Sequence, residues 1–503
     1  MRRRRFLKTV SLASAGAASF GILRYPRTAH AGWGAWPEEK IDALLPPERR
    51  AKKVLEIFMY GGVSAFDSFY CVPTWGESNG SFLNAYRAET EARFADCGFG
   101  DANSLTEPFA EDENGTLVHL GPWAIPLRQR PDISSRMRVL TTRHDQLAHE
   151  GANPLALSGN RLGSPRLAGT GASIQRHALE REGGLRAAPY AYVLYPGVEF
   201  PTDNVGAGSA VGLHPGTATP LSLTVSAGSQ LTSLLSRNGV GANREAFDNA
   251  MAYYVNAYQQ RFRVGGKGSP IRSQSRSNYE FSNYTRKNAD AIQSVLDPSF
   301  FEPIAGSECG TNATDMPAMQ MRLATALLTR STDAASYVQV IDGGITPNPN
   351  AGHDTHDGHV NYASRNIPHT LRTLAENINQ PGENDPAKID LDETLIVITT
   401  EFGRTPERQG STGLNHWPQG YASVVIGGPV TAAEKGVYGY ITPDQGIAQN
   451  WMTPAELRMS IMVAMGIYPF SAETFAVGDV LGGVANEFEA AVRIREQYLG
   501  VKL

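Results

Sequence analysis

The stretch Thr394-Leu395-Ile396-Val397-Ile398-Thr399-Thr400 is the clearest strand of the chain, and it runs directly into Glu401-Phe402-Gly403-Arg404. An unbroken run of apolar and β-branched residues is typical of a strand that is buried on both faces. Such strands belong to parallel sheets that are covered by helices. The polar residues that follow are therefore expected at the carboxyl end of a central strand.

The same pattern recurs along the chain, with short apolar runs that end in glycine-rich or polar loops. Two stretches between the runs, 315–329 and 361–378, carry apolar residues at close to helical spacing and predict helices. Strands that alternate with helices predict an α/β fold, with a mostly parallel sheet, helices on both faces and a site at the carboxyl ends of the strands. The other predicted strands are 54–60, 138–141, 190–195, 337–341 and 423–426.

The middle of the chain differs in composition. Residues 203–245 are rich in Gly, Ser, Ala and Thr, and residues 264–286 are rich in Arg, Ser, Asn and Gly. Such stretches build little core, and they predict long inserted loops or a cap around 203–290. Residues 32–50 read as an exposed leader, and 51–503 as one domain carrying these insertions.

The first residues predict export. Arg3-Arg4-Arg5-Phe6-Leu7-Lys8 has the form of a twin-arginine signal, and an apolar stretch and Ala29-His30-Ala31 follow it as a cleavage site. We therefore expect residues 1–31 to be a signal peptide, the twin-arginine export machinery to be a partner, and the mature protein to be periplasmic or secreted.

Charge and cysteine content exclude several classes of protein. The signal carries seven Lys or Arg and no acid, so its removal takes the formal net charge from −5 to −12. An acidic chain is poorly suited to nucleic acid, whose binding depends on Lys and Arg. The mature part has no apolar run of about 18 residues, so no stable membrane span is expected. The three cysteines, Cys71, Cys97 and Cys309, allow one disulfide and form no thiolate metal motif.

The densest group of ligand-type residues is Gly352-His353-Asp354-Thr355-His356-Asp357-Gly358-His359. Metal ions bind neutral imidazole and ionised carboxylate, and this loop supplies both. Other ligand-type residues also follow predicted strands, so they are expected at the same edge of the sheet. These are Asp67, His149, Glu401 and His416.

Three motifs carry a resemblance to a known family. They are GGVSAFDSFYCVP at 61–73, GHDTH at 352–356 and TLIVITTEFGRTP at 394–406. With the GG-bearing strand that follows, they resemble the exported bacterial family named domain of unknown function 1501, within the alkaline-phosphatase and sulfatase superfamily. The resemblance covers residues 54 to 440.

The superfamily resemblance implies a site in which one or two divalent cations clamp a phosphate or sulfate ester. Histidine and carboxylate ligands suit Zn, Mn and Fe, and to a lesser extent Ca or Mg. Arg404 would contact the anionic substrate, with a structural ion pair as the alternative. The metal ligands implied are Asp67, Asp354, His356 and His416, with Glu401 at the position of a superfamily aspartate and His353 as a further candidate.

The chain departs from the superfamily pattern at three positions. His149 stands near the place of the Ser, Thr or Cys nucleophile, Asn415 replaces the aspartate of a D-H pair, and Phe402 replaces a histidine ligand. The attacking group would then be a metal-bound water or His149 itself. These departures leave two hypotheses open: an exported metal-dependent hydrolase of small phosphate or sulfate esters, and a non-catalytic metal-containing binding or assembly protein. A cofactor-bearing redox protein is a third possibility, which only the export route suggests.

Overall fold

The computed structural model describes most of the chain from residue 33 onward. The predicted signal peptide and most of the predicted insertion lie outside the described residues. The described ranges are 33–75, 97–99, 106–162, 164, 169–181, 188–196, 220–225, 244–265, 288–306, 309, 314–346, 352–410, 412–471 and 474–503.

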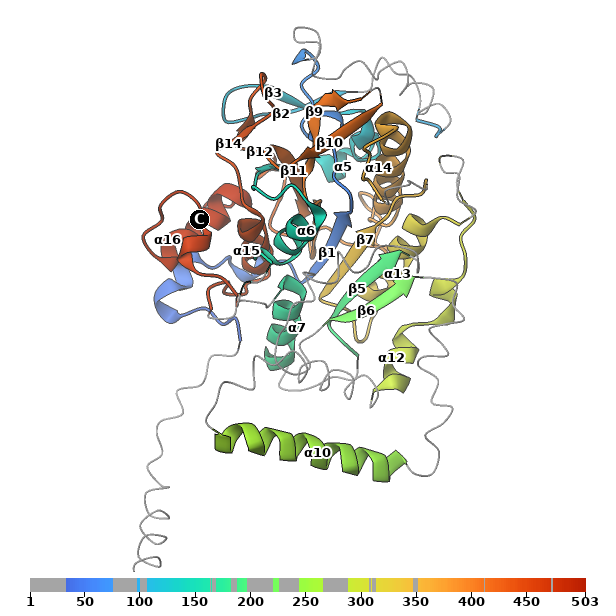
Figure 1. Cartoon of the computed structure of the whole chain (residues 1–503), viewed down its shortest axis with the longest axis vertical. Helices are drawn as coiled ribbons and strands as arrows, with labels where there is room; N and C mark the ends of the chain where they lie inside the picture. The colour runs from blue at the N-terminus through green and yellow to red at the C-terminus, as the bar shows by residue number, and fades with distance from the viewer. Residues whose placement is uncertain are drawn as a thin grey trace, which may run out of the picture.

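An eight-stranded sheet forms the centre of the molecule (Figure 1). β11 runs antiparallel to both of its neighbours, β8 and β4, whereas the other neighbouring strands are parallel. The predicted mostly parallel α/β sheet is therefore confirmed. The strands lie in the order β12 (Gly436–Tyr438), β4 (Met137–Thr142), β11 (Tyr421–Gly427), β8 (Thr394–Thr399), β1 (Lys53–Met59), β7 (Tyr337–Asp342), β5 (Ala191–Pro196) and β6 (Leu221–Val225).

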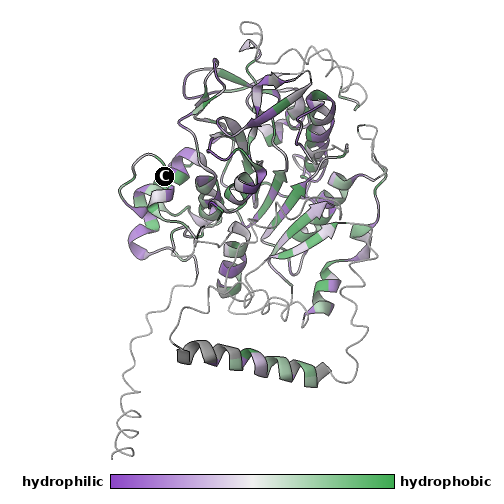
Figure 2. Ribbon diagram, in the orientation of Figure 1, coloured by the Kyte–Doolittle hydropathy of each residue, from purple (hydrophilic) through white to green (hydrophobic). Residues whose placement is uncertain are grey.

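Helices cover both faces of this sheet, because alternate side chains of its strands point to opposite sides. On β1, Leu55, Ile57 and Met59 join a core with α13 (Met316–Thr329) and α14 (His359–Glu376). Val54 of β1 packs on the other side with α7 (Thr170–Arg181) and α15 (Pro454–Ala464), and Phe58 packs there with α6 (His149–Ser158). The apolar strands thus lie between two layers of helices (Figures 1 and 2). Each such buried side chain contributes about 1.5–3 kcal/mol to folding.

Three regions differ from the sequence-based expectation. β6 lies inside the segment 203–245, which we had predicted to be loop, and it forms an edge of the main sheet. The leader 32–50 is only partly exposed, since Ala43 and Leu45 are fully buried. The C-terminal helices α15 and α16 (Glu487–Arg493) were not anticipated, although α15 starts with a complete capping box at Thr453 and Glu456.

A disulfide joins Cys97 to Cys309, and the buried Cys71 lies outside it. The bond joins residues that are 212 positions apart in the sequence. It links the described segment 97–99 to Cys309, which precedes α13. Among the described helices, none is long and apolar enough to cross a membrane.

Candidate functional site

The loop after β1 packs directly against the histidine-rich loop that follows β7. Gly61 has a φ of 113°, and a Cβ atom there would lie 2.1 Å from the backbone nitrogen of Asp354. The backbone N–H of His353 donates to the carbonyl of Tyr60 at 2.6 Å. Only glycine permits this approach, which fixes the position of Asp354 at the carboxyl end of the sheet.

A hairpin after β8 closes the site from the other side. It consists of β9 (Gly403–Gln409) and β10 (Gly413–Trp417). A Cβ atom on Gly413 would lie 1.6 Å from the carbonyl oxygen of His356, and the N–H of Leu414 donates to the carbonyl of Thr355 at 3.1 Å. This contact places His416, on β10, over the histidine-rich loop.

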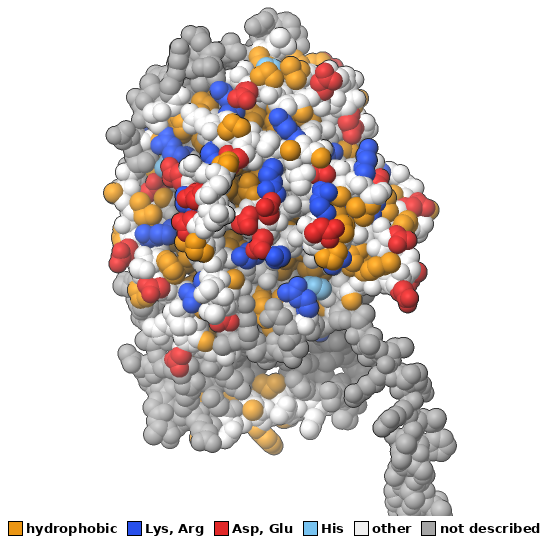
Figure 3. Space-filling model, turned by 180° about the vertical axis from the view of Figure 1, so that it is seen from behind, with side chains coloured by type: hydrophobic (Ala, Val, Ile, Leu, Met, Phe, Trp, Pro, Cys, Tyr) orange, Lys and Arg blue, Asp and Glu red, His pale blue; other side chains and the backbone are white. Residues whose placement is uncertain are grey.

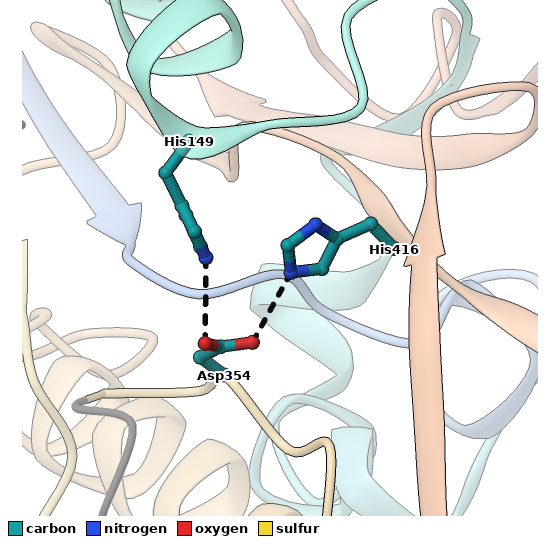
Figure 4. Close-up of side chains that lie close together, drawn as sticks. All are labelled: His149, Asp354 and His416. Atoms are coloured by element: carbon teal, nitrogen blue, oxygen red, sulfur yellow. Dashed lines mark hydrogen bonds and ion pairs between the residues drawn. The ribbon is translucent and has the colours of Figure 1, made fainter. Parts of the chain in front are cut away.

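Three side chains from separate parts of the chain converge here: His149, Asp354 and His416 (Figure 4). Nε2 of His149, the first residue of α6, lies 3.4 Å from Oδ2 of Asp354. Nε2 of His416 lies 3.3 Å from Oδ1 of the same carboxylate. One ligand atom from each residue lies within 4.8 Å of the other two, which is close enough for a single ion to be shared.

His356 extends this group, which we call the His–Asp cluster: His149, Asp354, His356 and His416. Nε2 of His356 lies 3.2 Å from Oδ1 of Asp354 and 2.9 Å from Nε2 of His416. Its side chain is 30% exposed, against 15% for His149 and 13% for His416. The cluster is therefore reached from the side of His356.

Each of the three imidazoles in the cluster uses its Nδ1 for a contact with an oxygen atom. His149 Nδ1 lies 2.9 Å from Oε1 of Glu401, and His416 Nδ1 lies 2.7 Å from the carbonyl oxygen of Leu147. His356 Nδ1 lies 3.0 Å from Oε1 of Gln409. Since a carbonyl or carboxylate oxygen only accepts, each Nδ1 carries its proton, and in the neutral ring Nε2 presents a lone pair.

The cluster fits a divalent cation. Three Nε2 atoms and the Asp354 carboxylate face one another, and their lone pairs repel unless a proton or a metal ion lies between them. His149 Nε2 is buried and has no hydrogen-bond partner among the described residues. An oxygen acceptor on the far nitrogen is the usual support of a histidine that binds metal. The donor set matches Zn or Mn better than the oxygen-seeking Ca or Mg.

The charge state of the cluster follows from its packing. Burial opposes protonation of His149, but its contacts with Asp354 and Glu401 outweigh burial and raise its pKa to about 9. Burial likewise disfavours the ionised form of Asp354. The contacts from His149 and His416 and the positive charge of Arg404 are stronger, and they hold the pKa of Asp354 well below its usual range. Without a metal ion, the cluster therefore holds an ionised Asp354 carboxylate beside a protonated His149 at neutral pH.

Arg404 and Glu401 lie behind the cluster. Arg404 is fully buried; its guanidinium donates to the carbonyls of Gly61 and Leu414 and to Oδ1 of Asp354. Glu401 is also fully buried, and its Oε1 accepts from the N–H of Gly61 at 2.7 Å besides contacting His149. Because Arg404 is fully buried, its position does not favour the predicted contact with a substrate. It favours the alternative, a structural ion pair with Asp354. Glu401 contacts Nδ1 of His149 and so orients a candidate ligand. This differs from the prediction that Glu401 is itself a metal ligand.

Two other predicted ligands lie outside the cluster, in buried pairs of their own. His353 Nε2 lies 2.9 Å from Oδ2 of Asp342, at the end of β7. Asp67 Oδ2 lies 3.5 Å from Nε2 of His359, while Asp67 Oδ1 has no hydrogen-bond partner among the described residues. Burial lowers the pKa of His359, although the nearby Asp67 opposes this shift. His359 belongs to the histidine-rich loop, whereas Asp342 had no signal in the sequence beyond its residue type, because such pairs form only once the loops pack.

These features define the class of protein: an α/β protein with a candidate cation site at the carboxyl edge of its sheet. A family model described as protein of unknown function (DUF1501) matches residues 51–488, and the chain belongs to this family. No curated protein matches the chain.

Proposed function

We propose that this protein is an exported metal-dependent hydrolase of phosphate or sulfate esters, with its metal held by the His–Asp cluster. The observation that carries the proposal is the orientation of the imidazoles, whose Nδ1 atoms contact oxygen atoms while their Nε2 atoms face Asp354. A divalent cation bound here would supply positive charge to an ester oxygen and to the charge that develops during displacement.

The residues of the His–Asp cluster and their supports would then have separate roles. His149, Asp354 and His416 bind the cation, and His356 is placed either to complete its coordination or to meet the substrate. Glu401 and the carbonyl of Leu147 hold two of the imidazoles in the orientation that binding requires. Nδ1 of His149 contacts Glu401 and its Nε2 would bind the metal ion, so we assign His149 to metal binding and not to attack on the ester.

One observation favours the second candidate, a non-catalytic metal-containing binding or assembly protein. Arg404 is fully buried, and its guanidinium donates to backbone carbonyls and to Asp354, so it is not exposed to an anionic substrate. A catalytic site for ester dianions usually presents such a donor at its surface.

The experiment that tests the proposal measures metal content and turnover on the same preparation. Mature protein made without chelators should contain at least one tightly bound divalent ion per chain by elemental analysis. A panel of aryl phosphate and aryl sulfate esters, with Zn, Mn, Ca or Mg added, should reveal hydrolysis that is lost in His416→Gln. His119→Gln, a half-buried histidine of β3 (Leu117–Leu120) outside the cluster, is the matched control. Metal without turnover supports the second candidate, and protein free of metal contradicts both.

Metal binding should release protons. His149 is protonated at neutral pH in the metal-free protein, because its pKa is about 9, and a histidine must lose that proton to bind metal. We expect release of about one proton per metal at pH 7, and an apparent affinity that rises up to about tenfold per pH unit until pH 9. Calorimetric titration in buffers of different ionisation enthalpy measures the release. A heat of binding that is independent of the buffer would contradict the assignment of His149 as a ligand.

The same pKa sets the sign of the stability effect in metal-free protein. The pKa of His149 is higher in the folded state than the ordinary value of 6.5. Its contribution to stability is therefore complete below pH 6.5 and is lost as the pH rises toward 9. Metal-saturated protein should lack this loss, since the metal then replaces the proton.

A further inference from the structure

A pocket lies at the opposite edge of the sheet from the His–Asp cluster. It has a volume of about 520 Å³ and is bounded by the residues that precede β1 and β7, by α7 and by the turn after α15. A pocket of this size accommodates a small molecule. Because the cluster lies at the carboxyl ends of the strands and this pocket at their amino ends, the two are separate sites.

The ionisable groups that line the described part of this pocket are all basic. They are Arg50 and Lys52 before β1, and His177 and Arg181 on α7, and the described lining residues include no Asp or Glu. On the face shown in Figure 3, acidic and basic side chains are interspersed. A concentration of positive charge in a concave site is unexpected in a chain whose net charge is −5, and it attracts anions.

Arg50 is the basic residue of this pocket that has no carboxylate partner among the described residues. It is half-buried, its Nε donates to the carbonyl of Leu45 at 2.6 Å, and it forms no ion pair with a described carboxylate. Burial lowers its pKa, and only the charge of Glu48 opposes the shift. Lys52 is more exposed and pairs with Glu393 at 2.5 Å. A partly desolvated guanidinium without a carboxylate partner is poised to bind one from a ligand.

The remaining wall of the pocket is apolar. Ile174 and Ala178 are buried on the same helix that carries His177 and Arg181, and Met465 packs beside them. We propose that this pocket binds a small organic anion, with a carboxylate or phosphate group held by Arg50 and Arg181 and an apolar part against Ile174 and Ala178. The proposal does not depend on the function of the His–Asp cluster.

Calorimetric titration of chelator-treated mature protein tests this proposal, with inorganic phosphate and hexanoate as separate probes. Chelation removes metal from the cluster, so a signal from that site does not interfere. We expect saturable binding of at least one probe, and the probe that binds more tightly distinguishes a phosphate ligand from a carboxylate. Arg50→Gln and Arg181→Gln should each weaken binding about tenfold, as expected for the loss of one charge-assisted hydrogen bond.

Two further variants keep the test decisive. Lys52→Gln changes an exposed side chain that pairs with Glu393, and it should weaken binding to a smaller extent. Arg161→Gln removes a similarly exposed cation that pairs with Asp145 on another part of the surface, and it should leave binding unchanged. The proposal is overturned if neither probe binds saturably to the unmodified protein, or if binding survives unchanged in both Arg50→Gln and Arg181→Gln. The metal content of these variants should match that of the unmodified protein.

Discussion

Replacing His416 with glutamine will weaken the binding of a divalent metal ion to the protein by at least about 100-fold, since loss of a direct ligand exceeds the 10–100-fold cost of losing an outer partner. His416 is a suitable position because its Nε2 faces Asp354 while its Nδ1 is held by the backbone of Leu147. Asp354 keeps its ion pair with Arg404, so the substitution leaves no buried charge unpaired. Competition with a chromogenic chelator at constant pH measures the change in affinity.

Three further variants distinguish a metal ligand from a residue that only orients a ligand. Glu401→Gln removes the negative charge beside His149 Nδ1 while keeping an oxygen acceptor there, and it should cost up to about 10–100-fold. Asp67→Asn and His119→Gln should leave this affinity unchanged, because neither residue belongs to the cluster. If Glu401→Gln costs as much as His416→Gln, then Glu401 is itself a ligand, as its place in the sequence motif had implied. Unchanged affinity in His416→Gln would remove the metal site altogether.

The sheet could be predicted from the sequence because its strands are buried on both faces. Runs such as 394–400 are apolar throughout, and each predicted run lies within or next to an observed strand. Strand direction left no such trace. The sequence of β11 resembles those of the parallel strands, yet β11 runs antiparallel to both of its neighbours, so Gly427 and Gly428 lie at the edge away from the cluster. β6 was missed because its segment shares the small-residue composition of a loop.

The site could be predicted in part, for a different reason. The sequence motifs singled out Asp354, His356 and His416, and the packing brings all three together. Which carboxylate pairs with which histidine is decided by loop contacts that no spacing encodes. His353 could therefore not be distinguished from its neighbours, although it turns away to Asp342. His149 was proposed as an attacking group because of its position, whereas its neighbours make it a ligand in our proposal.

Behind the cluster, a fully buried ion pair links β1 to α6 and α15. Nη1 of Arg458, on α15, donates to Oε2 of Glu56 at 2.6 Å, and its Nε donates to the carbonyl of Ala156 on α6 at 2.7 Å. Glu56 also accepts from the hydroxyl of Tyr337 at 2.6 Å and from Nε2 of Gln339 at 2.9 Å. Both charged side chains have no exposure to solvent. The pair therefore depends on these contacts alone to offset the loss of hydration.

Arg458→Met should consequently lower the free energy of unfolding by about 3–5 kcal/mol, because it leaves the Glu56 carboxylate buried without its cation. Adding Glu56→Gln to this variant should restore part of the loss, since the amide keeps hydrogen bonds to Tyr337 and Gln339 without a charge. Urea unfolding of the four proteins of this double-mutant cycle measures both effects. Arg161→Met, which breaks the exposed pair with Asp145, should cost less than about 1 kcal/mol and serves as the control. A double variant no more stable than Arg458→Met would show that the lost contact of Arg458 with α6, and not the unpaired carboxylate, causes the destabilisation.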